Sequence, residues 1–349
     1  MGLLPIAVPT VFIWILLRAH SFAGASDWSQ LIPTDLKVDV LQVLIAVLLI
    51  TLLAVAVQPF QLRIVRLLEG YWDGWWLTAL LAPVFVEYQT RKKQGLAARI
   101  NRLDARLGEL EVSPPAGTLQ EQKRRQREGA RKSAAQRRAE DKLQRYPRRP
   151  DAGKPETPLL PTALGNALRA GETSAGERYG LTTLVSWPRL YPLLSDKLAT
   201  VHASARDSLD AAASFCVSFF VVFVIAVAAL VDEPKAYWIP AVALGLCCVS
   251  YIGSIAAAVT YTTYVRVAFD LHRFDLLKAM HQKLPHTLSE EYNQFAQLSE
   301  FFLKETTGVA ADGLAARVLQ NRQYVHTDEP AAPTTSPSLW EFLGRLGRR

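Results

Sequence analysis

Long apolar runs alternate with polar stretches along this chain. The segment Val38–Val57 is apolar at all but three positions, and residues 211–231 and 236–265 carry no charge at all. A membrane-spanning helix needs about 20 apolar residues, because each residue rises about 1.5 Å and the hydrocarbon layer is about 30 Å thick. The pattern therefore predicts a mostly α fold: a polytopic α-helical membrane protein with a cytoplasmic helical hairpin and a small mixed elbow.

The first apolar segment, Gly2–Leu17, is short and contains Pro5 and Pro9. We favour a retained, kinked membrane helix, and a re-entrant or interfacial helix is the first alternative. A cleaved signal peptide is the second, since residues 23–25 (Ala-Gly-Ala) resemble a cleavage site. No Lys or Arg precedes Arg18, which disfavours the signal peptide.

Basic residues are concentrated in one block and predict the topology. Residues 91–149 hold about 18 basic and about 7 acidic side chains, a local balance of about +11, whereas the whole chain carries +7. Short flanks rich in Lys and Arg stay in the cytoplasm. We therefore expect four spans in a bacterial inner membrane, both termini and residues 61–209 in the cytoplasm, and the loops 19–35 and 232–235 outside.

The domain organisation follows from these segments. Trp75–Val86 is apolar but too short to span, so we interpret it as an interfacial or re-entrant helix, with a helix buried in the cytoplasmic domain as the alternative. The predicted parts are an N-terminal membrane hairpin (1–60), an interfacial or re-entrant helix (61–90), a basic helical hairpin (91–149), a linker (150–161), a cytoplasmic elbow (162–209), a C-terminal membrane hairpin (210–265), cytoplasmic helices (266–326) and a linker with a terminal amphipathic helix (327–349).

The basic block is predicted to form two helices. Residues 113–117 contain two prolines and end the first helix. Residues 118–146 form the second helix, which is nearly all polar. A coiled coil of two heptads is marginal, so we expect the hairpin to self-associate or to bind a partner. The first helix has apolar residues at the a and d spacing of a coiled coil: Leu96, Ile100, Leu103, Leu107 and Leu110.

Three interpretations of the basic charge remain open. It forms a solvated face that fixes topology, it attracts anionic lipid headgroups, or it binds nucleic acid or an acidic partner. Nucleic-acid binding gains from aromatic side chains on which bases stack. Tyr146 is the single aromatic residue of the block, which disfavours nucleic acid.

The segment before the second pair of spans carries a distinctive arrangement. It reads Leu-Gly-Asn at 164–166, followed by Arg169 and Glu172, then Arg-Tyr-Gly at 178–180 and Trp-Pro-Arg-Leu at 187–190; residues 268–277 follow the last span. Over about residues 160–300 this arrangement resembles a group of uncharacterised bacterial multi-pass membrane proteins. The resemblance implies this architecture and no activity.

Polar residues in these segments are the candidates for a ligand or partner site. Arg pairs with carboxylates in a bidentate manner, and Arg169 and Glu172 are i,i+3 neighbours. The interpretation we favour is a salt-bridged elbow. A helix with Thr162 as its cap begins the elbow. Residues 181–185 favour an extended segment, which continues no further than Pro188. The candidates are Asn166, Arg169, Glu172, Glu177, Arg178, Tyr179, Trp187, Arg189, Asp270, His272, Arg273 and Asp275.

The sequence contains no recognisable catalytic or cofactor motif. It has no phosphate-binding loop, dinucleotide turn, zinc spacing or nucleophile elbow. His272 and Asp275 are i,i+3 neighbours that could share a metal ion, but Arg273 beside them opposes a cation. We therefore expect no metal, no cofactor and no enzyme.

Residues 287–290 match a capping box that opens a helix. Residues 327–337 are rich in Pro, and 338–349 are predicted to form a short basic amphipathic helix. Small residues at i,i+4 in the last span favour helix packing or oligomerisation.

The expected function is a scaffold or regulator of a partner at the cytoplasmic face. Expected partners are the bilayer with its anionic headgroups, and a protein partner or a second copy of the chain. The alternatives are a small ion channel or pore-forming effector lined by Ser and Thr, and a membrane enzyme in which Glu172, Glu177 and Arg178 converge.

Overall fold

The described part of the chain is all-α and contains no strand. The computed structural model describes residues 3–22, 26–28, 44–45, 47–49, 51–53, 55–56, 61–72, 74, 76–112, 118–147 and 158–307. Two compact units form: Met1–Glu177 with Leu194–Phe269, and Arg178–Leu193 with Asp270–Arg349. The predicted helical class is confirmed, whereas the expected extended part of the elbow is not found among these residues.

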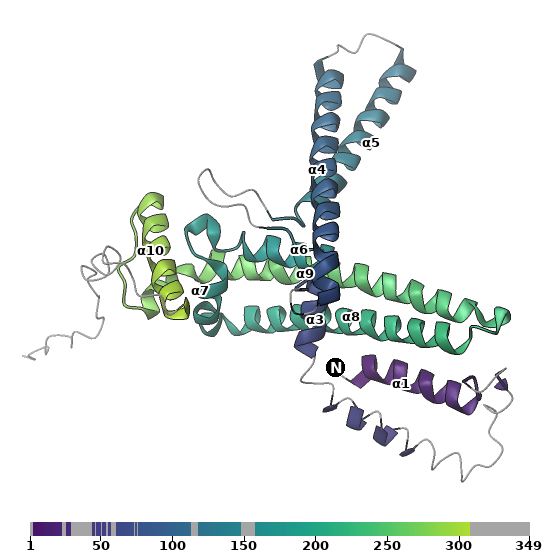
Figure 1. Cartoon of the computed structure of the whole chain (residues 1–349). Coiled ribbons are helices and arrows are strands. Elements are labelled where there is room, and N and C mark those ends of the chain that lie inside the picture. Colours follow the sequence, from purple (N-terminus) through teal and green to yellow (C-terminus); the bar gives the residue numbers. More distant parts are fainter. Residues whose placement is uncertain are drawn as a thin grey trace, which may run out of the picture. The chain divides into compact units, whose positions relative to one another are not determined.

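Two long apolar helices pair in the first unit (Figure 1). Helix α8 (Asp196–Ala229) and the segment Pro234–Ala279, which contains α9 (Trp238–Ala279), are long and apolar enough to cross a membrane. The Sγ atoms of Cys216 and Cys247 lie 3.7 Å apart, and the rings of His202 and Tyr261 lie 4.8 Å apart. Cys216 follows His202 on α8, whereas its partner Cys247 precedes Tyr261 on α9. The residue numbers therefore run in opposite directions along the two helices, which are antiparallel.

Helix α1 (Leu3–Arg18) packs along α8. An apolar cluster joins Leu16 of α1 to Ala226, Leu230 and Ala236. With 16 residues, α1 falls short of the length of a spanning helix. The predicted span at 38–57 lies largely outside the described residues, so two of the four expected spans are found as long helices.

Two loops that we predicted to lie outside the membrane contact each other. The amide of Ser26 donates to Glu233 Oε1 at 2.5 Å, and hydrogen bonds from Ser26 lower the pKa of Glu233. This contact joins the segment after α1 to the turn between α8 and α9. The charge pattern predicted that both loops lie on the same side of the membrane, and this contact is consistent with that prediction.

The region around residues 61–112 differs from the expected division. Helix α3 (Gln61–Glu69) ends at Gly70, whose φ of +94° suits glycine, and the amides of Gly70 and Tyr71 both donate to Arg66 O at 3.1 Å. Helix α4 (Trp76–Val112) then continues through Pro83 without a break at residue 90. The helix therefore crosses the division that we expected at residue 90, because good helix formers lie on both sides of it.

Helices α4 and α5 (Leu119–Leu143) form the predicted hairpin. Thr118 precedes α5, and its amide donates to Glu121 Oε2 at 3.1 Å. At the hairpin base, Tyr146 Oη donates to Gln89 Oε1 at 2.8 Å, and Lys93 Nζ donates to the Pro147 carbonyl at 2.9 Å. Burial raises the pKa of Tyr146 to about 12, which keeps this phenol a donor at every physiological pH. The base of the hairpin is therefore fixed by side-chain hydrogen bonds.

Helix α6 (Ala163–Glu172) begins where the sequence predicts. Thr162 Oγ1 accepts a hydrogen bond from the Gly165 amide at 3.0 Å, which confirms the predicted cap. The apolar face of α6 packs on both long helices. This cluster consists of Leu164, Ala167, Leu168, Leu209, Ile255 and Ala258.

The second unit contains Arg178 and Tyr179 of η3 (Glu177–Tyr179), α7 (Thr183–Leu190), η4 (Tyr191–Leu193) and α10 (Leu288–Thr307). The extended segment predicted at 181–185 is wrong at residues 183–185, which belong to α7, and α7 runs past Pro188 to Leu190. One helical face, at i, i+3 and i+7, buries Thr183, Ser186 and Leu190, so packing overrides the β-branched local preference. The predicted cap of α10 is present, with Thr287 Oγ1 accepting from the Glu290 amide at 3.2 Å.

Candidate functional site

Five of the side chains in the second unit form a closed network. Asp270 forms an ion pair with Arg178 and accepts a hydrogen bond from Tyr179 Oη at 2.9 Å. Arg273 Nε donates to Glu291 Oε1 at 2.7 Å, and its guanidinium lies 4.2 Å from the Tyr179 ring centroid. Two arginines meet two carboxylates, so the network is neutral. Both ion pairs are internal to the second unit.

The other predicted residues of the second unit engage separate neighbours. The Arg189 guanidinium lies 4.1 Å from the Phe302 ring centroid, and the rings of Trp187 and Tyr191 are 5.7 Å apart. His272 Nδ1 lies 3.0 Å from Asp275 Oδ2. Burial alone would raise the pKa of Asp275, but its hydrogen bonds with His272 and Lys278 bring that pKa below its ordinary value. No cluster with the donors of a metal site occurs among the described residues.

In the first unit, Asn166 and Arg169 hold the chain that leads into α6. Asn166 is fully buried; its amide nitrogen donates to the Leu160 carbonyl at 2.7 Å, and its Oδ1 accepts from the Leu160 amide at 2.9 Å. Arg169 Nη1 donates to the Pro158 carbonyl at 2.6 Å. Both side chains thus form hydrogen bonds with backbone groups of the preceding segment, which gives each of them a structural role.

Glu172 belongs to a carboxyl pair that the sequence analysis missed. Burial and the nearby charge of the other carboxylate raise the pKa of Glu69, at the end of α3, and burial raises that of Glu172, at the end of α6. Arg206 opposes both shifts and itself donates to Asp210 Oδ2 at 3.1 Å. The i,i+4 spacing of Arg206 and Asp210, just before an uncharged span, was the one signal in the sequence for a charged cluster here. No sequence pattern indicated that Glu69 lies near this cluster.

Glycines let α6 approach its neighbours closely. A Cβ at Gly165 would lie 1.8 Å from the Glu69 carbonyl oxygen, and one at Gly171 would lie 2.1 Å from Thr262 Cβ. In addition, the Tyr251 hydroxyl of α9 accepts from the amides of Ala163 and Leu164 at 3.2 and 3.4 Å. A span residue thereby satisfies the first amides of α6, which have no partner within the helix.

Hydroxyl groups of the long helices bond to their own backbones. Ser218 Oγ donates to the Ser214 carbonyl at 2.9 Å, and Thr263 Oγ1 donates to the Val259 carbonyl at 2.8 Å. Ser254 is buried and donates to the Tyr251 carbonyl at 2.8 Å. These hydroxyls carry no sign of a hydrophilic path within one copy of the chain.

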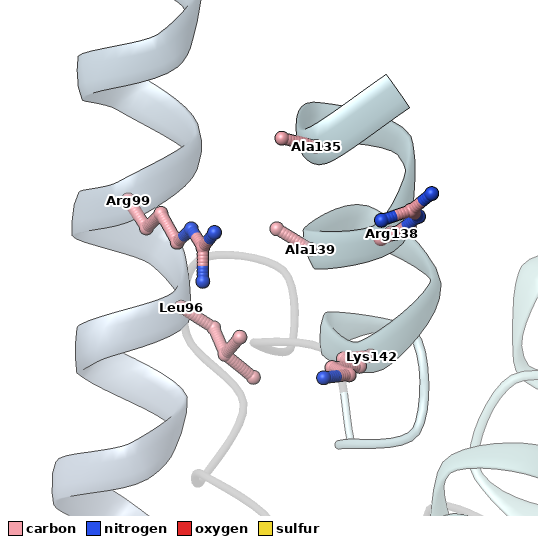
Figure 2. Close-up of a pocket in the computed structure, with 6 residues that line it drawn as sticks. All are labelled: Leu96, Arg99, Ala135, Arg138, Ala139 and Lys142. Atoms are coloured by element: carbon pink, nitrogen blue, oxygen red, sulfur yellow. The ribbon is translucent and has the colours of Figure 1, made fainter. Parts of the chain in front are cut away.

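The hairpin differs from both networks, because much of its charge faces outward. Lys123, Arg127 and Arg131 of α5 are exposed, and none forms a hydrogen bond or ion pair with another described residue. Figure 2 shows a pocket between the two helices, where Leu96 and Arg99 of α4 face Ala135 and Ala139 of α5. The hairpin is therefore a further candidate functional surface beside the polar residues around 162–190 and 270–275.

In its described part, the chain is an all-α protein with two helices long enough to cross a membrane and a basic helical hairpin. Comparison of the chain with protein-family models, with curated proteins and with solved structures finds no match.

Proposed function

We propose that this protein is a membrane scaffold or regulator that uses the α4–α5 hairpin to hold an acidic partner protein at the cytoplasmic face. The observation that carries the proposal is the outward basic row Lys123, Arg127 and Arg131. These residues stand four apart on α5, so they share one helix face. Unneutralised charge of one sign on a hairpin face attracts a surface of the opposite sign and accelerates association.

The shape of the hairpin supports the same conclusion. Its inner seam packs one helix on the other, and its base is held by the Tyr146–Gln89 hydrogen bond. The charged row contributes to neither contact. A helical arm whose charged face makes no contact within the hairpin is suited to recognition, because its backbone is already ordered before a partner binds.

Self-association is a second part of this proposal. Gly245 and Gly253 of α9 have no atom within 4 Å of an added Cβ, so their faces are open in one copy of the chain. Together with Ala241 and Ala257 they form two i,i+4 pairs of small residues, which favour close helix packing in lipid. A second copy is the occupant that we expect on this face.

Affinity capture from native membranes in a mild detergent, with nuclease present, tests the partner. The tagged full-length protein should retain a stoichiometric protein, and Lys123→Gln, Arg127→Gln and Arg131→Gln together should release it. The matched control removes three other hairpin charges, at Arg99, Arg138 and Lys142, and should retain the partner. Raising the salt concentration should weaken capture, because salt screens exposed charges.

Two outcomes would overturn the proposal. The first is equal capture by the wild type and the outward-row variant. The second is ion conduction in liposomes, or turnover of a substrate, by the purified protein alone. Conduction that disappears when Gly253 is replaced by Leu would instead identify a channel.

A further inference from the structure

Three cationic residues line a small pocket between the helices of the hairpin, and Figure 2 shows Arg99 directed into the gap and the Arg138 guanidinium turned away from it. We propose that this pocket is a binding site for a phosphate-class oxyanion, held by Arg99 of α4 and by Arg138 and Lys142 of α5. The pocket has a volume of about 200 Å³. Its lining is completed by Leu96, Ala135 and Ala139.

The pocket arises because small residues of α5 lie opposite Leu96, the first apolar residue of the coiled-coil seam on α4. Ala135 and Ala139 are i,i+4 neighbours on the face of α5 that meets Leu96. Two methyl groups cannot fill the gap that larger side chains fill in an ordinary coiled-coil seam. Ala139 is buried, with 3% of its surface exposed, so the side of the pocket that the two alanines form is apolar.

The charge around the space is unbalanced. No carboxylate lines the pocket, and within the described residues Arg99, Arg138 and Lys142 make no ion pair or side-chain hydrogen bond. The nearby Glu140 is engaged elsewhere, since its Oε1 accepts from Gln136 Nε2 at 3.0 Å. Like charges at i,i+4, such as Arg138 and Lys142, destabilise a helix. An anion between them removes this repulsion.

Size and donor geometry select the class of ligand. A volume of about 200 Å³ is below the roughly 300–1,000 Å³ of pockets for drug-sized ligands, so the pocket suits one phosphate group. Guanidinium groups present planar pairs of donors that match phosphate oxygens, and a lysine adds a compact point charge. The phosphate group belongs either to a free phosphate or to the phosphomonoester headgroup of a lipid.

This site is separate from the outward row that we assign to the partner. Lys123, Arg127 and Arg131 do not line the pocket, and they lie closer to the tip of the hairpin along α5. The two sets each remove three positive charges when changed to Gln. Each set therefore serves as the charge-matched control of the other.

Calorimetric titration of inorganic phosphate into the full-length protein, in a non-ionic detergent at constant ionic strength, tests the site. The wild type should show saturable binding. The variant Arg99→Gln, Arg138→Gln, Lys142→Gln should bind at least about tenfold more weakly, because charge-assisted hydrogen bonds are lost. The outward-row triple variant should stay within about twofold of the wild type, because its charges are exposed and do not line the pocket, so salt and solvent screen them.

A second variant tests the cavity without changing any charge. Ala135→Leu fills the space and should abolish phosphate binding while the helix content by circular dichroism stays unchanged. Flotation with phosphatidic acid vesicles, compared with phosphatidylcholine vesicles, distinguishes the sources. Flotation that depends on the pocket triple and is reversed by phosphate indicates a lipid headgroup, whereas calorimetric binding without flotation indicates a soluble ligand.

Three results would overturn the site: no saturable binding of phosphate and no flotation by the wild type, equal weakening by both triple variants, or unchanged binding by Ala135→Leu. Equal weakening would show that the general field of the hairpin attracts anions. None of these outcomes depends on whether a protein partner is captured.

Discussion

The hairpin and the second unit both rely on arginine, but they use it in opposite ways. In the second unit, Arg178 and Arg273 meet Asp270 and Glu291, and the Arg273–Glu291 pair is largely buried, with side chains 18% and 7% exposed. In the hairpin, residues such as Arg131 face outward without an ion-pair partner among the described residues.

An arginine enclosed by carboxylates and aromatic rings holds a structure together. An arginine whose charge is not neutralised within the fold is available to a partner or an anion. The number of arginines in a segment is therefore a poor guide to function, and their neutralisation within the fold is a better one.

The largest expected effect separates these two uses of arginine directly. Arg273→Met leaves Glu291 buried without its partner, and we expect a loss of about 3–5 kcal/mol in the free energy of unfolding. The matched change Arg131→Met on the hairpin should alter it by no more than about 0.5 kcal/mol. Thermal unfolding of both variants in detergent, followed by tryptophan fluorescence, provides the measurement. Similar shifts for both would contradict the contrast.

A pair of glycines sharpens the comparison between tight and open packing. Gly165→Ala places a methyl group against the Glu69 carbonyl and should destabilise the protein by about 1–3 kcal/mol or more, as overpacking does. Gly129 of α5 has nothing within 4 Å of an added Cβ, so Gly129→Ala should stabilise the helix by about 0.5–1 kcal/mol. The melting temperature should fall for Gly165→Ala and rise for Gly129→Ala. If both variants shift it in the same direction, α6 does not pack against Glu69 as described.

The carboxyl pair predicts a pH dependence in the first unit. Because burial raises the pKa of Glu69 and Glu172 above their ordinary value of 4.5, the folded protein binds protons more tightly than the unfolded chain. Their contribution to stability is fully present below about pH 4.5 and is lost as the pH rises through the folded pKa.

Glu69→Gln with Glu172→Gln should therefore raise the melting temperature near neutral pH, and the gain should shrink toward about pH 4.5. Asp207→Asn, which changes an exposed carboxyl of α8, is the control and should have little effect at either pH. A gain that grows on acidification would disprove the burial of the pair.

The smallest expected effect concerns the surface pair of His272 and Asp275. Asp275→Asn should cost about 0.2–0.5 kcal/mol near neutral pH, as for other i,i+3 and i,i+4 pairs on helices. Since the folded pKa of Asp275 is lowered, its contribution is present above the ordinary value of 3.8 and is lost as the pH falls through the folded pKa. Equal stabilities of variant and wild type at neutral pH would mean that solvent screens this pair completely.

The caps and the long apolar helices were predictable because their signals are local. Thr162 and Thr287 open the helices that their sequences predict. The uncharged stretch 211–231 lies in α8 up to Ala229, and the stretch 236–265 lies in the segment that contains α9. The same local reasoning failed at residues 183–185. There, a weak β preference was outweighed by the burial of Thr183 and Leu190 on one face of α7.

The sequence by itself determined the helical class, the apolar segments, the caps and the hairpin with its excess of positive charge, since each depends on neighbours within a few residues. Only the tertiary structure decided which charges are neutralised. It paired Arg273 with Glu291, brought Glu69 toward Glu172 and left Arg99, Arg138 and Lys142 around an open space. These outcomes depend on residues far apart in the chain, whose distance no local pattern encodes.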